Sequence, residues 1–219
     1  MTLPRMLARL ADVCRTRPLA EKWLLAPNLR VGRQWIQQIA FSGVSAVNLR
    51  VQTIRGLAAE LAGPEMIRRN VSPLGSLQAE FLMDRLIAGT HAELEYLSRT
   101  PATPRLSQTV LRAVESIRLE GLAEPPPLDR FESPAKGRDL LRLADAFRRE
   151  CTQRSLLDGA DVLRWAVRRL QDDPTALPGD LLLLLPVDQD FCTLERALIQ
   201  AFPSDRVLPS LDKAVETAK

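Results

Sequence analysis

The sequence predicts an α/β protein in which a large all-helical insertion interrupts a small parallel sheet. Short apolar runs near both ends of the chain are bounded by turn-forming residues, as is typical of strands. Helical periodicity separates these runs, which favours parallel pairing through right-handed crossovers. Between the two groups of runs, over residues 72–173, the pattern predicts helices and no strand.

The first part of the chain predicts two strands. Apolar residues at helical spacing over 3–16 indicate a helix, and Trp23–Pro27 is an apolar run stopped by proline, which predicts a buried strand. Asn28 then stands where it can cap a helix that ends near residue 43. The β-rich run 47–53 predicts a second strand. A short helix, Ile54–Leu61, should follow and end at Gly63 and Pro64.

The insertion predicts a series of helices separated by proline and glycine. Ser107 is expected to cap one of them, Asp158 is expected to begin the last, and Pro125–Pro127 should form a stiff connector. The expected helices cover 74–88, 91–97, 107–121, 136–152 and 158–173.

The last part returns to the sheet. Leu181–Leu185 is an unbroken leucine run, which suits a central strand that is covered on both faces. A helix over 191–202 and a short edge strand, Arg206–Leu208, should follow. We therefore predict an α/β core formed by residues 1–71 and 174–219, with residues 72–173 as a helical insertion subdomain.

Composition excludes several classes of protein. The chain has 219 residues, of which 46% are hydrophobic and 26% charged, with a formal net charge of +3. Its longest apolar run is far shorter than the roughly 20 residues of a membrane-spanning helix, and its first residues contain no secretory signal. The cysteines, Cys14, Cys151 and Cys192, have no metal-ligand spacing. We therefore expect a cytoplasmic protein without a membrane partner, and not a disordered, fibrous or disulfide-framework protein.

Motifs for catalysis are missing. No glycine is followed by the Lys-Ser or Lys-Thr of a phosphate-binding loop, and Pro186 follows the leucine strand where a magnesium-binding acid would be needed. His91 is the only histidine and has no nucleophile motif near it. Asp188, Asp190 and Glu195 are acidic residues that fit helix capping better than metal binding. We expect no catalytic residue, no metal and no cofactor.

Basic residues are concentrated in the first third of the chain, and nearly all are arginines. Arg30 and Arg33 follow the first predicted strand, and Arg55 follows the second. Ligands of open parallel sheets approach the carboxyl ends of the strands, and arginine clusters suit phosphate oxygens. These side chains therefore form either an edge that contacts nucleic acid or a set of unrelated surface arginines.

Several segments resemble one protein family in the family's own order. Lys22–Asn28 and Leu49–Ala58 resemble the N-terminal helicase-like domain of AddB, the nuclease subunit of the AddAB helicase–nuclease that processes double-strand breaks for recombination. Ser155–Leu163 resembles the family's "L-x-D-x-x-D-L-L" segment, and Asp190–Glu195 resembles its "D-F-T-x-x-E". The pattern Leu106–Leu122 resembles a helix of the family that ends in glycine followed by leucine or isoleucine. The wider relatives are the UvrD/RecB-type superfamily 1 helicases.

The resemblance implies a P-loop/RecA-like sheet that lacks the P-loop, and therefore an ATPase-inactive domain that binds DNA or a helicase partner. The implied contacts to single-stranded DNA are Asn28, Arg30, Arg33, Thr53 and Arg55, which would touch its backbone. The implied partner is an AddA-like helicase subunit. The family's nuclease domain is not in this chain, so we expect an N-terminal fragment of a longer protein or a stand-alone remnant. A protein–protein scaffold without DNA contact is the alternative.

Overall fold

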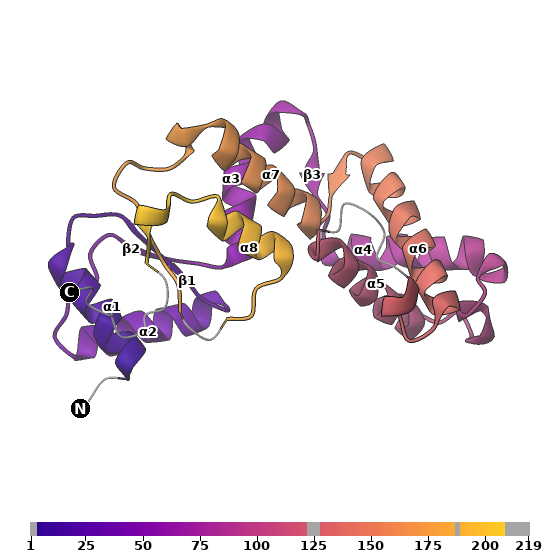
Figure 1. Cartoon of the computed structure of the whole chain (residues 1–219), viewed down its shortest axis with the longest axis horizontal. Helices are drawn as coiled ribbons and strands as arrows, with labels where there is room; N and C mark the ends of the chain where they lie inside the picture. Colours follow the sequence, from indigo (N-terminus) through magenta and orange to yellow (C-terminus); the bar gives the residue numbers. More distant parts are fainter. Residues whose placement is uncertain (1–3, 122–127, 187–188, 209–219) are drawn as a thin grey trace. The chain divides into compact units, whose positions relative to one another are not determined.

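The computed structural model describes residues 4–121, 128–186 and 189–208 (Figure 1). The chain divides into two compact units. The sheet unit comprises Met1–Leu61, Trp165–Phe191 and Glu195–Lys219, and the helical unit comprises Ala62–Arg164 and Cys192–Leu194. The predicted fold class is confirmed at the level of an α/β protein that combines a small parallel sheet with mostly helices.

The sheet unit contains four parallel strands in the order β2-β1-β5-β6. Trp23 of β1 pairs with Arg50 of β2 on one side and with Leu183 of β5 on the other. The leucine run therefore contains an inner strand, as predicted, and the strand residues Leu182–Leu184 are buried. The strands are β1 (Lys22–Leu25), β2 (Leu49–Gln52), β5 (Leu182–Leu184) and β6 (Val207–Leu208).

Helices cover both faces of this sheet (Figure 1). α1 (Arg5–Thr16) and α2 (Leu29–Phe41) lie on one face, where Leu10 and Ile39 pack in one core with Leu24 and Leu184. α3 (Ile54–Arg68) and α8 (Thr193–Gln200) lie on the other face. Burial on both faces explains why the inner strands read as continuous apolar runs rather than as alternating ones.

Close packing of α2 against β2 depends on a glycine. Gly32 is buried in the first turns of α2, and a Cβ atom there would overlap the side chain of Val51. Asn28 caps the same helix, because its Oδ1 accepts a hydrogen bond of 2.9 Å from the Val31 N–H. The predicted cap is therefore confirmed.

α3 is longer than the sequence analysis expected. The helix was predicted to end at Gly63 and Pro64, but it continues through Pro64 to Arg68. That prediction is wrong because Ala62 and Met66 beyond the expected end are buried. Burial of a continuing apolar face outweighs the backbone hydrogen bond that proline removes.

The helical unit is built around three neighbouring helices, α4 (Ser76–Thr90), α5 (Pro104–Leu119) and α6 (Pro134–Gln153). Their shared core includes Met83, Val114 and Phe147, each fully buried. Asp139 of α6 fixes the segment after α4, since its carboxylate accepts hydrogen bonds of 2.8–3.0 Å from three successive backbone N–H groups, Glu95 to Leu97. A single buried carboxylate thus binds the backbone between two short 3₁₀ turns, His91–Glu93 and Leu97–Arg99.

Three predictions for the insertion are wrong. Residues 72–173 do contain strands, because β3 (Ser72–Pro73) pairs in parallel with β4 (Leu156–Leu157). The stretch 91–97 is not one helix but contains the short 3₁₀ turns His91–Glu93 and Leu97–Arg99. α5 begins at Pro104 under a Thr103 cap, so Ser107 is a buried helical residue.

Of two other predictions for this region, one falls outside the described residues and one is confirmed. The expected connector Pro125–Pro127 lies outside the described residues. Asp158 does cap α7 (Gly159–Asp172), because its Oδ1 accepts a hydrogen bond of 2.9 Å from the Asp161 N–H. Three short 3₁₀ turns complete the described elements, at Leu128–Arg130, Pro174–Ala176 and Ser204–Arg206.

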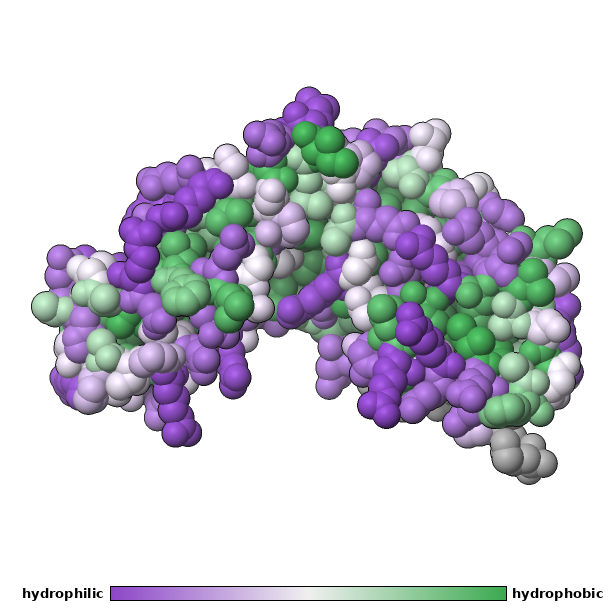
Figure 2. Space-filling model, turned by 180° about the vertical axis from the view of Figure 1, so that it is seen from behind, coloured by the Kyte–Doolittle hydropathy of each residue, from purple (hydrophilic) through white to green (hydrophobic). Residues whose placement is uncertain are grey.

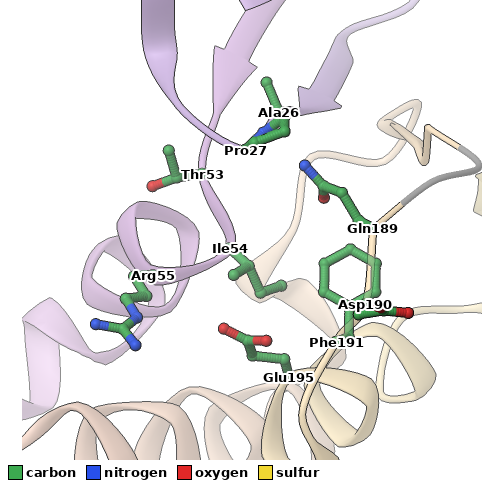
Figure 3. A pocket seen from close by; sticks show the side chains of 9 residues that line it. All are labelled: Ala26, Pro27, Thr53, Ile54, Arg55, Gln189, Asp190, Phe191 and Glu195. Atoms are coloured by element: carbon green, nitrogen blue, oxygen red, sulfur yellow. The ribbon is translucent and has the colours of Figure 1, made fainter. Parts of the chain in front are cut away.

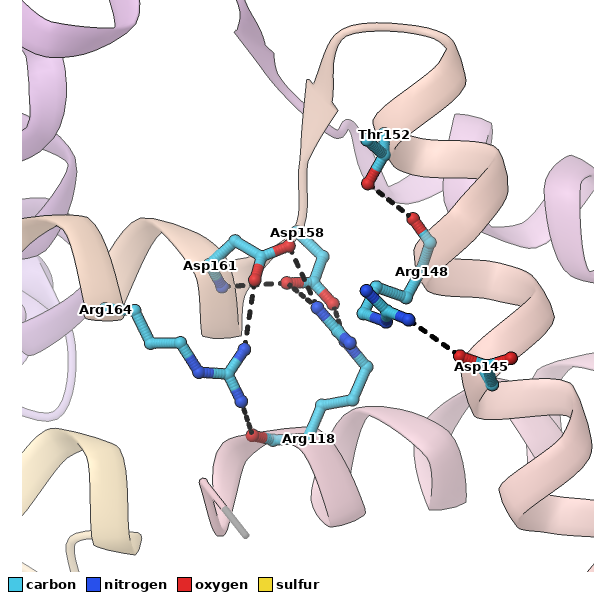
Figure 4. Close-up of polar contacts among 7 residues, drawn as sticks. All are labelled: Arg118, Asp145, Arg148, Thr152, Asp158, Asp161 and Arg164. Carbon is cyan, nitrogen blue, oxygen red and sulfur yellow. Dashed lines mark hydrogen bonds and ion pairs between the residues drawn. The ribbon is translucent and has the colours of Figure 1, made fainter. Parts of the chain in front are cut away.

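A buried ionic cluster joins α5 to the start of α7 (Figure 4). Arg118 Nη2 donates to Asp158 Oδ1 at 3.1 Å and to Asp161 Oδ2 at 2.9 Å, and its Nε donates to the other Asp158 oxygen. Arg164 donates to Asp161 and to the backbone oxygen of Arg118. Every charged group in the cluster therefore has an opposite charge beside it, as burial requires.

Surface character gives no sign of a membrane span. No described helix combines the length and the apolarity that crossing a lipid bilayer requires. Figure 2 shows hydrophobic residues interspersed among hydrophilic ones on one face of the molecule.

Candidate functional site

A cavity of about 460 Å³ opens in the sheet unit where β1, β2 and β5 end (Figure 3). Ala26 and Pro27 directly follow β1, and Thr53 to Arg55 directly follow β2. The remaining side of the cavity comes from the segment after β5 and from α8. The residues on that side are Gln189, Asp190, Phe191 and Glu195. The cavity thus lies at the carboxyl edge of the parallel sheet, where such folds bind ligands.

Two helices begin at this edge of the sheet. α2 starts after β1 and α3 starts after β2, and the two strands are hydrogen-bonded neighbours. Thr53 Oγ1 accepts a hydrogen bond of 3.0 Å from the Gly56 N–H, which makes Thr53 a capping residue of α3. The same edge therefore carries the positive ends of two helix dipoles.

The structure brings only part of the predicted site into the cavity. Thr53 and Arg55 line it (Figure 3). Asn28, Arg30 and Arg33 do not; they belong to the start of α2, outside the cavity wall. Because β1 and β2 are adjacent and parallel, both groups nevertheless lie at the carboxyl edge of the sheet.

The predicted arginines at this edge are available to a ligand. Arg30, Arg33 and Arg55 are exposed, and none forms an ion pair or a side-chain hydrogen bond with a residue that the structure describes. Arg50, in β2 itself, is instead held by Glu60 at 2.8 Å, and the buried Gln52 donates to the other oxygen of that carboxylate. Arg50 is therefore held by a structural partner, whereas Arg30, Arg33 and Arg55 have no side-chain partner among the described residues.

The cavity itself combines apolar walls with both signs of charge. The side chains of Ile54 and Phe191 face each other across it (Figure 3). Arg55 supplies a guanidinium donor, whereas Asp190 and Glu195 supply carboxylate acceptors. Such a lining suits a ligand that presents an apolar or aromatic body, an anionic group and N–H donors.

The described residues provide no catalytic set near this cavity. No group of three or more described His, Cys, Asp or Glu side chains could hold a metal ion, and Asp188 lies outside the described residues. His91 belongs to the helical unit, where its Nε2 lies 2.8 Å from the Thr100 carbonyl oxygen. Burial raises the pKa of the Cys14 thiol and raises that of Cys151 to about 12, so both thiols are poor nucleophiles.

Seven of the nine residues that line the cavity were not predicted as site residues, and four of these seven come from the segment after β5 and from α8. Asp190 and Glu195 were interpreted as an acidic cluster at a helix end, and Gln189 and Phe191 were not singled out. All four follow the third predicted strand, at the edge where Thr53 and Arg55 follow the second. The parallel order of the strands is the signal that could have joined these segments into one site.

Comparison with known proteins does not identify the chain. No protein-family model matches it, and a search of the curated proteins gives no match.

Proposed function

We propose that this chain is an ATPase-inactive, helicase-like binding domain that contacts the backbone of single-stranded DNA. The main support is that Arg30, Arg33 and Arg55 are exposed and have no side-chain partner among the described residues. They lie at the carboxyl edge of the sheet, where α2 and α3 begin. Unpaired guanidinium groups and helix N-termini both favour phosphate. The resemblance to AddB-type proteins adds a cytoplasmic role in double-strand-break repair, beside an AddA-like helicase subunit.

The cavity limits where the DNA backbone would pass. Asp190 and Glu195 repel phosphate, so the backbone would cross the edge at Arg55 and at the start of α2 rather than enter the cavity. The apolar side chains Ile54 and Phe191 suit the uncharged part of a nucleotide better. No residue of this edge is proposed to act as an acid, a base or a nucleophile.

A salt-dependent titration with fluorescent oligothymidylate tests the proposal. Each phosphate contact on a single strand contributes about −0.7 to the slope of log K against log salt. Replacing Arg30, Arg33 and Arg55 by alanine should flatten the slope by about two units and weaken binding of all sequences alike. Surface substitutions of this kind should change the free energy of unfolding by less than about 0.5 kcal/mol.

Arg17 offers a matched control, because it is exposed and follows α1 near the start of β1, at the opposite edge of the same sheet. Arg17→Ala should leave both affinity and slope unchanged. Equal affinity of the wild type and the triple variant at low salt would favour the alternative, a protein scaffold without DNA contact.

A further inference from the structure

The outer side of α1 and α2 is basic and poor in acidic residues. The two helices together contain five arginines and one acidic residue, Asp12. By contrast, the segment Trp165–Phe191 of the same unit contains two arginines and five aspartates. Positive charge is therefore distributed unevenly within the sheet unit. The five arginines, all exposed or half-buried, are Arg5, Arg9, Arg15, Arg30 and Arg33.

The two helices form one surface. Both pack on the same face of the sheet, where Leu10 of α1 and Ile39 of α2 share a core (Figure 1). α1 ends just before β1 and α2 begins just after it, so both helices run from the carboxyl edge toward the amino edge of the sheet. Arg5 and Arg30 therefore lie at the same end of the surface. Arg15 lies about 15 Å further along α1, at a rise of about 1.5 Å per residue.

Within the described residues, little on this surface neutralises the arginines. Arg5, Arg30 and Arg33 form no ion pair or side-chain hydrogen bond with a described residue. Arg15 Nε lies 3.5 Å from the backbone oxygen of Ala11 in its own helix, which leaves the charge of the guanidinium uncompensated. Five arginines and one aspartate give the two helices a formal charge of +4.

The side chains between the arginines are polar. Gln34 and Gln37 of α2 are exposed and follow the two arginines of that helix by one turn each. The large exposed apolar side chains of α2 stand at its two ends, Leu29 and Phe41, and Trp35 is half-buried. The centre of the surface therefore offers hydrogen-bond donors and positive charge, without an apolar or aromatic platform.

We propose that this α1/α2 surface binds the sugar–phosphate backbone of double-helical DNA. Guanidinium and amide groups are the donors that contact phosphate oxygens. The two ends of the surface are separated by slightly more than the roughly 12 Å width of the major groove, so arginines at both ends can reach phosphates on either side of it. The proposal rests on the proposed function for its partner, DNA, and adds a second surface and the duplex form.

Three other anionic or amphipathic partners fit this surface less well. Single strands bind by stacking their bases on aromatic side chains along a basic groove. An amphipathic protein helix needs an apolar groove, and a membrane surface needs apolar side chains that insert beside the basic ones. The centre of the α1/α2 surface provides none of these features among its described residues, whereas duplex backbone binding needs only charge and donors.

The test compares two fluorescent probes on the full chain, a blunt-ended duplex of about two helical turns and oligothymidylate. Arg5→Ala with Arg15→Ala should weaken duplex binding by about tenfold at low salt and leave oligothymidylate binding unchanged. Each duplex contact contributes about −0.9 to the slope of log K against log salt, so the slope should flatten by about two units. Arg55→Ala should weaken oligothymidylate binding alone, because Arg55 lies outside this surface.

Two further variants act as controls. Asp12→Asn removes the one acidic side chain of the two helices and should tighten duplex binding. Arg168→Ala removes an exposed arginine of α7 in the same unit, with no described partner, and should change neither affinity. Because all the substituted side chains are exposed, circular dichroism and the unfolding midpoint should stay at wild-type values.

The two DNA proposals can fail separately. Duplex binding that depends on Arg5 and Arg15, without any binding of oligothymidylate, would support this surface and contradict the single-strand contact. Oligothymidylate binding without duplex binding would overturn only the α1/α2 proposal. An equal loss of both probes in the Arg5→Ala and Arg15→Ala double variant would also overturn it, since both forms of DNA would then share one site. Binding of anionic lipid vesicles, without duplex binding, that this variant abolishes would make the surface a membrane site instead.

Discussion

Lys22 is a fully buried lysine that completes the end of α1. Its ammonium group donates hydrogen bonds to the backbone oxygens of Arg17, Pro18 and Ala20, just beyond the last turn of the helix. Carbonyl groups at a helix C-terminus lack partners within the helix and attract a cation. The charge that would be costly in an apolar core is thus used to bind three backbone acceptors.

Lys22→Met should therefore destabilise the sheet unit although it adds an apolar side chain to an apolar core. Removing the hydrogen-bond donor of these partly buried carbonyl groups is expected to cost about 1–3 kcal/mol. Urea denaturation followed by circular dichroism measures the loss. Lys136→Met is the control, because Lys136 pairs with an exposed Glu132 and should contribute less than about 1 kcal/mol. Equal effects of the two substitutions would contradict this role of Lys22.

The two aspartates beside Arg118 are expected to respond oppositely to neutralisation. Asp158 accepts two hydrogen bonds from the guanidinium group of Arg118 and caps α7, so Asp158→Asn should cost about 3–5 kcal/mol. Burial and the charge of Asp158 raise the pKa of Asp161, against the lowering effects of Arg118 and Arg164. The ionised Asp161 carboxylate is therefore less favourable in the folded chain than in the unfolded one.

It follows that Asp161→Asn should increase the free energy of unfolding at pH 7. Because the pKa of Asp161 is raised in the folded chain, the folded wild type takes up a proton there before the unfolded chain does as pH falls. The free energy of unfolding of the wild type should therefore rise as pH falls toward the ordinary pKa of 3.8. The stability difference between Asp161→Asn and wild type should shrink over the same range. Asp145→Asn is a control of opposite sign, since the Arg148 hydrogen bond lowers the pKa of Asp145 and its contribution is lost at low pH. Urea midpoints between pH 7 and pH 4 measure both. An Asp161→Asn variant that is less stable than wild type at pH 7 would contradict this assignment.

At the scale of elements, the sheet was predictable and the ends of helices were not. All four strands of the main sheet overlap predicted strand segments, although β1 begins one residue earlier than predicted, because doubly covered strands leave a clear apolar signal. The ladder of β3 and β4 has two residues in each strand, too few for any periodicity, so the expected strand-free insertion is wrong. Ser107 was predicted to cap α5 after a break at Pro104, but Thr103 is the cap, because proline is tolerated at the first position of a helix.

Pro64 gives a prediction for the element that differs most from expectation. It lies inside α3, where it cannot donate the backbone hydrogen bond to residue 60. Pro64→Ala should restore that bond and stabilise the chain, by about 1–3 kcal/mol, since alanine is the best helix former. Thermal and urea unfolding measure the gain, with the exposed Ala88→Ser as a neutral control at a helical surface. A loss of stability would show that α3 needs the bend that proline imposes.

At the scale of the whole molecule, the sequence predicted the sheet edge at which the cavity lies but only two of the residues that line the cavity. Thr53 and Arg55 were predictable because ligands gather where parallel strands end. Gln189 and Phe191 follow a strand that lies more than a hundred residues away in sequence, and only the strand order β2-β1-β5 brings them beside Thr53. That order depends on how the intervening helical segment returns the chain to the sheet, which local patterns do not encode.

The two units also have separate cores, and each core contains a buried thiol. Cys14 belongs to the core of the sheet unit and Cys151 to that of the helical unit, and the two cores share no described residue. Because burial raises the pKa of both thiols, neither should react at neutral pH until its own core opens. Each cysteine is therefore a reporter of the opening of one unit.

Met83→Ala should show whether the units unfold separately. Met83 is fully buried in the helical core, so its truncation should cost about 2–5 kcal/mol there. Pulsed thiol labelling with mass spectrometry at increasing urea should then find Cys151 modified at lower urea than in wild type, with the midpoint for Cys14 unchanged. Leu10→Ala, in the sheet core, should give the reverse pattern. α3 and α7 each contribute residues to both units, so a common shift of both thiols would mean that these continuous helices couple the two cores into one cooperative structure.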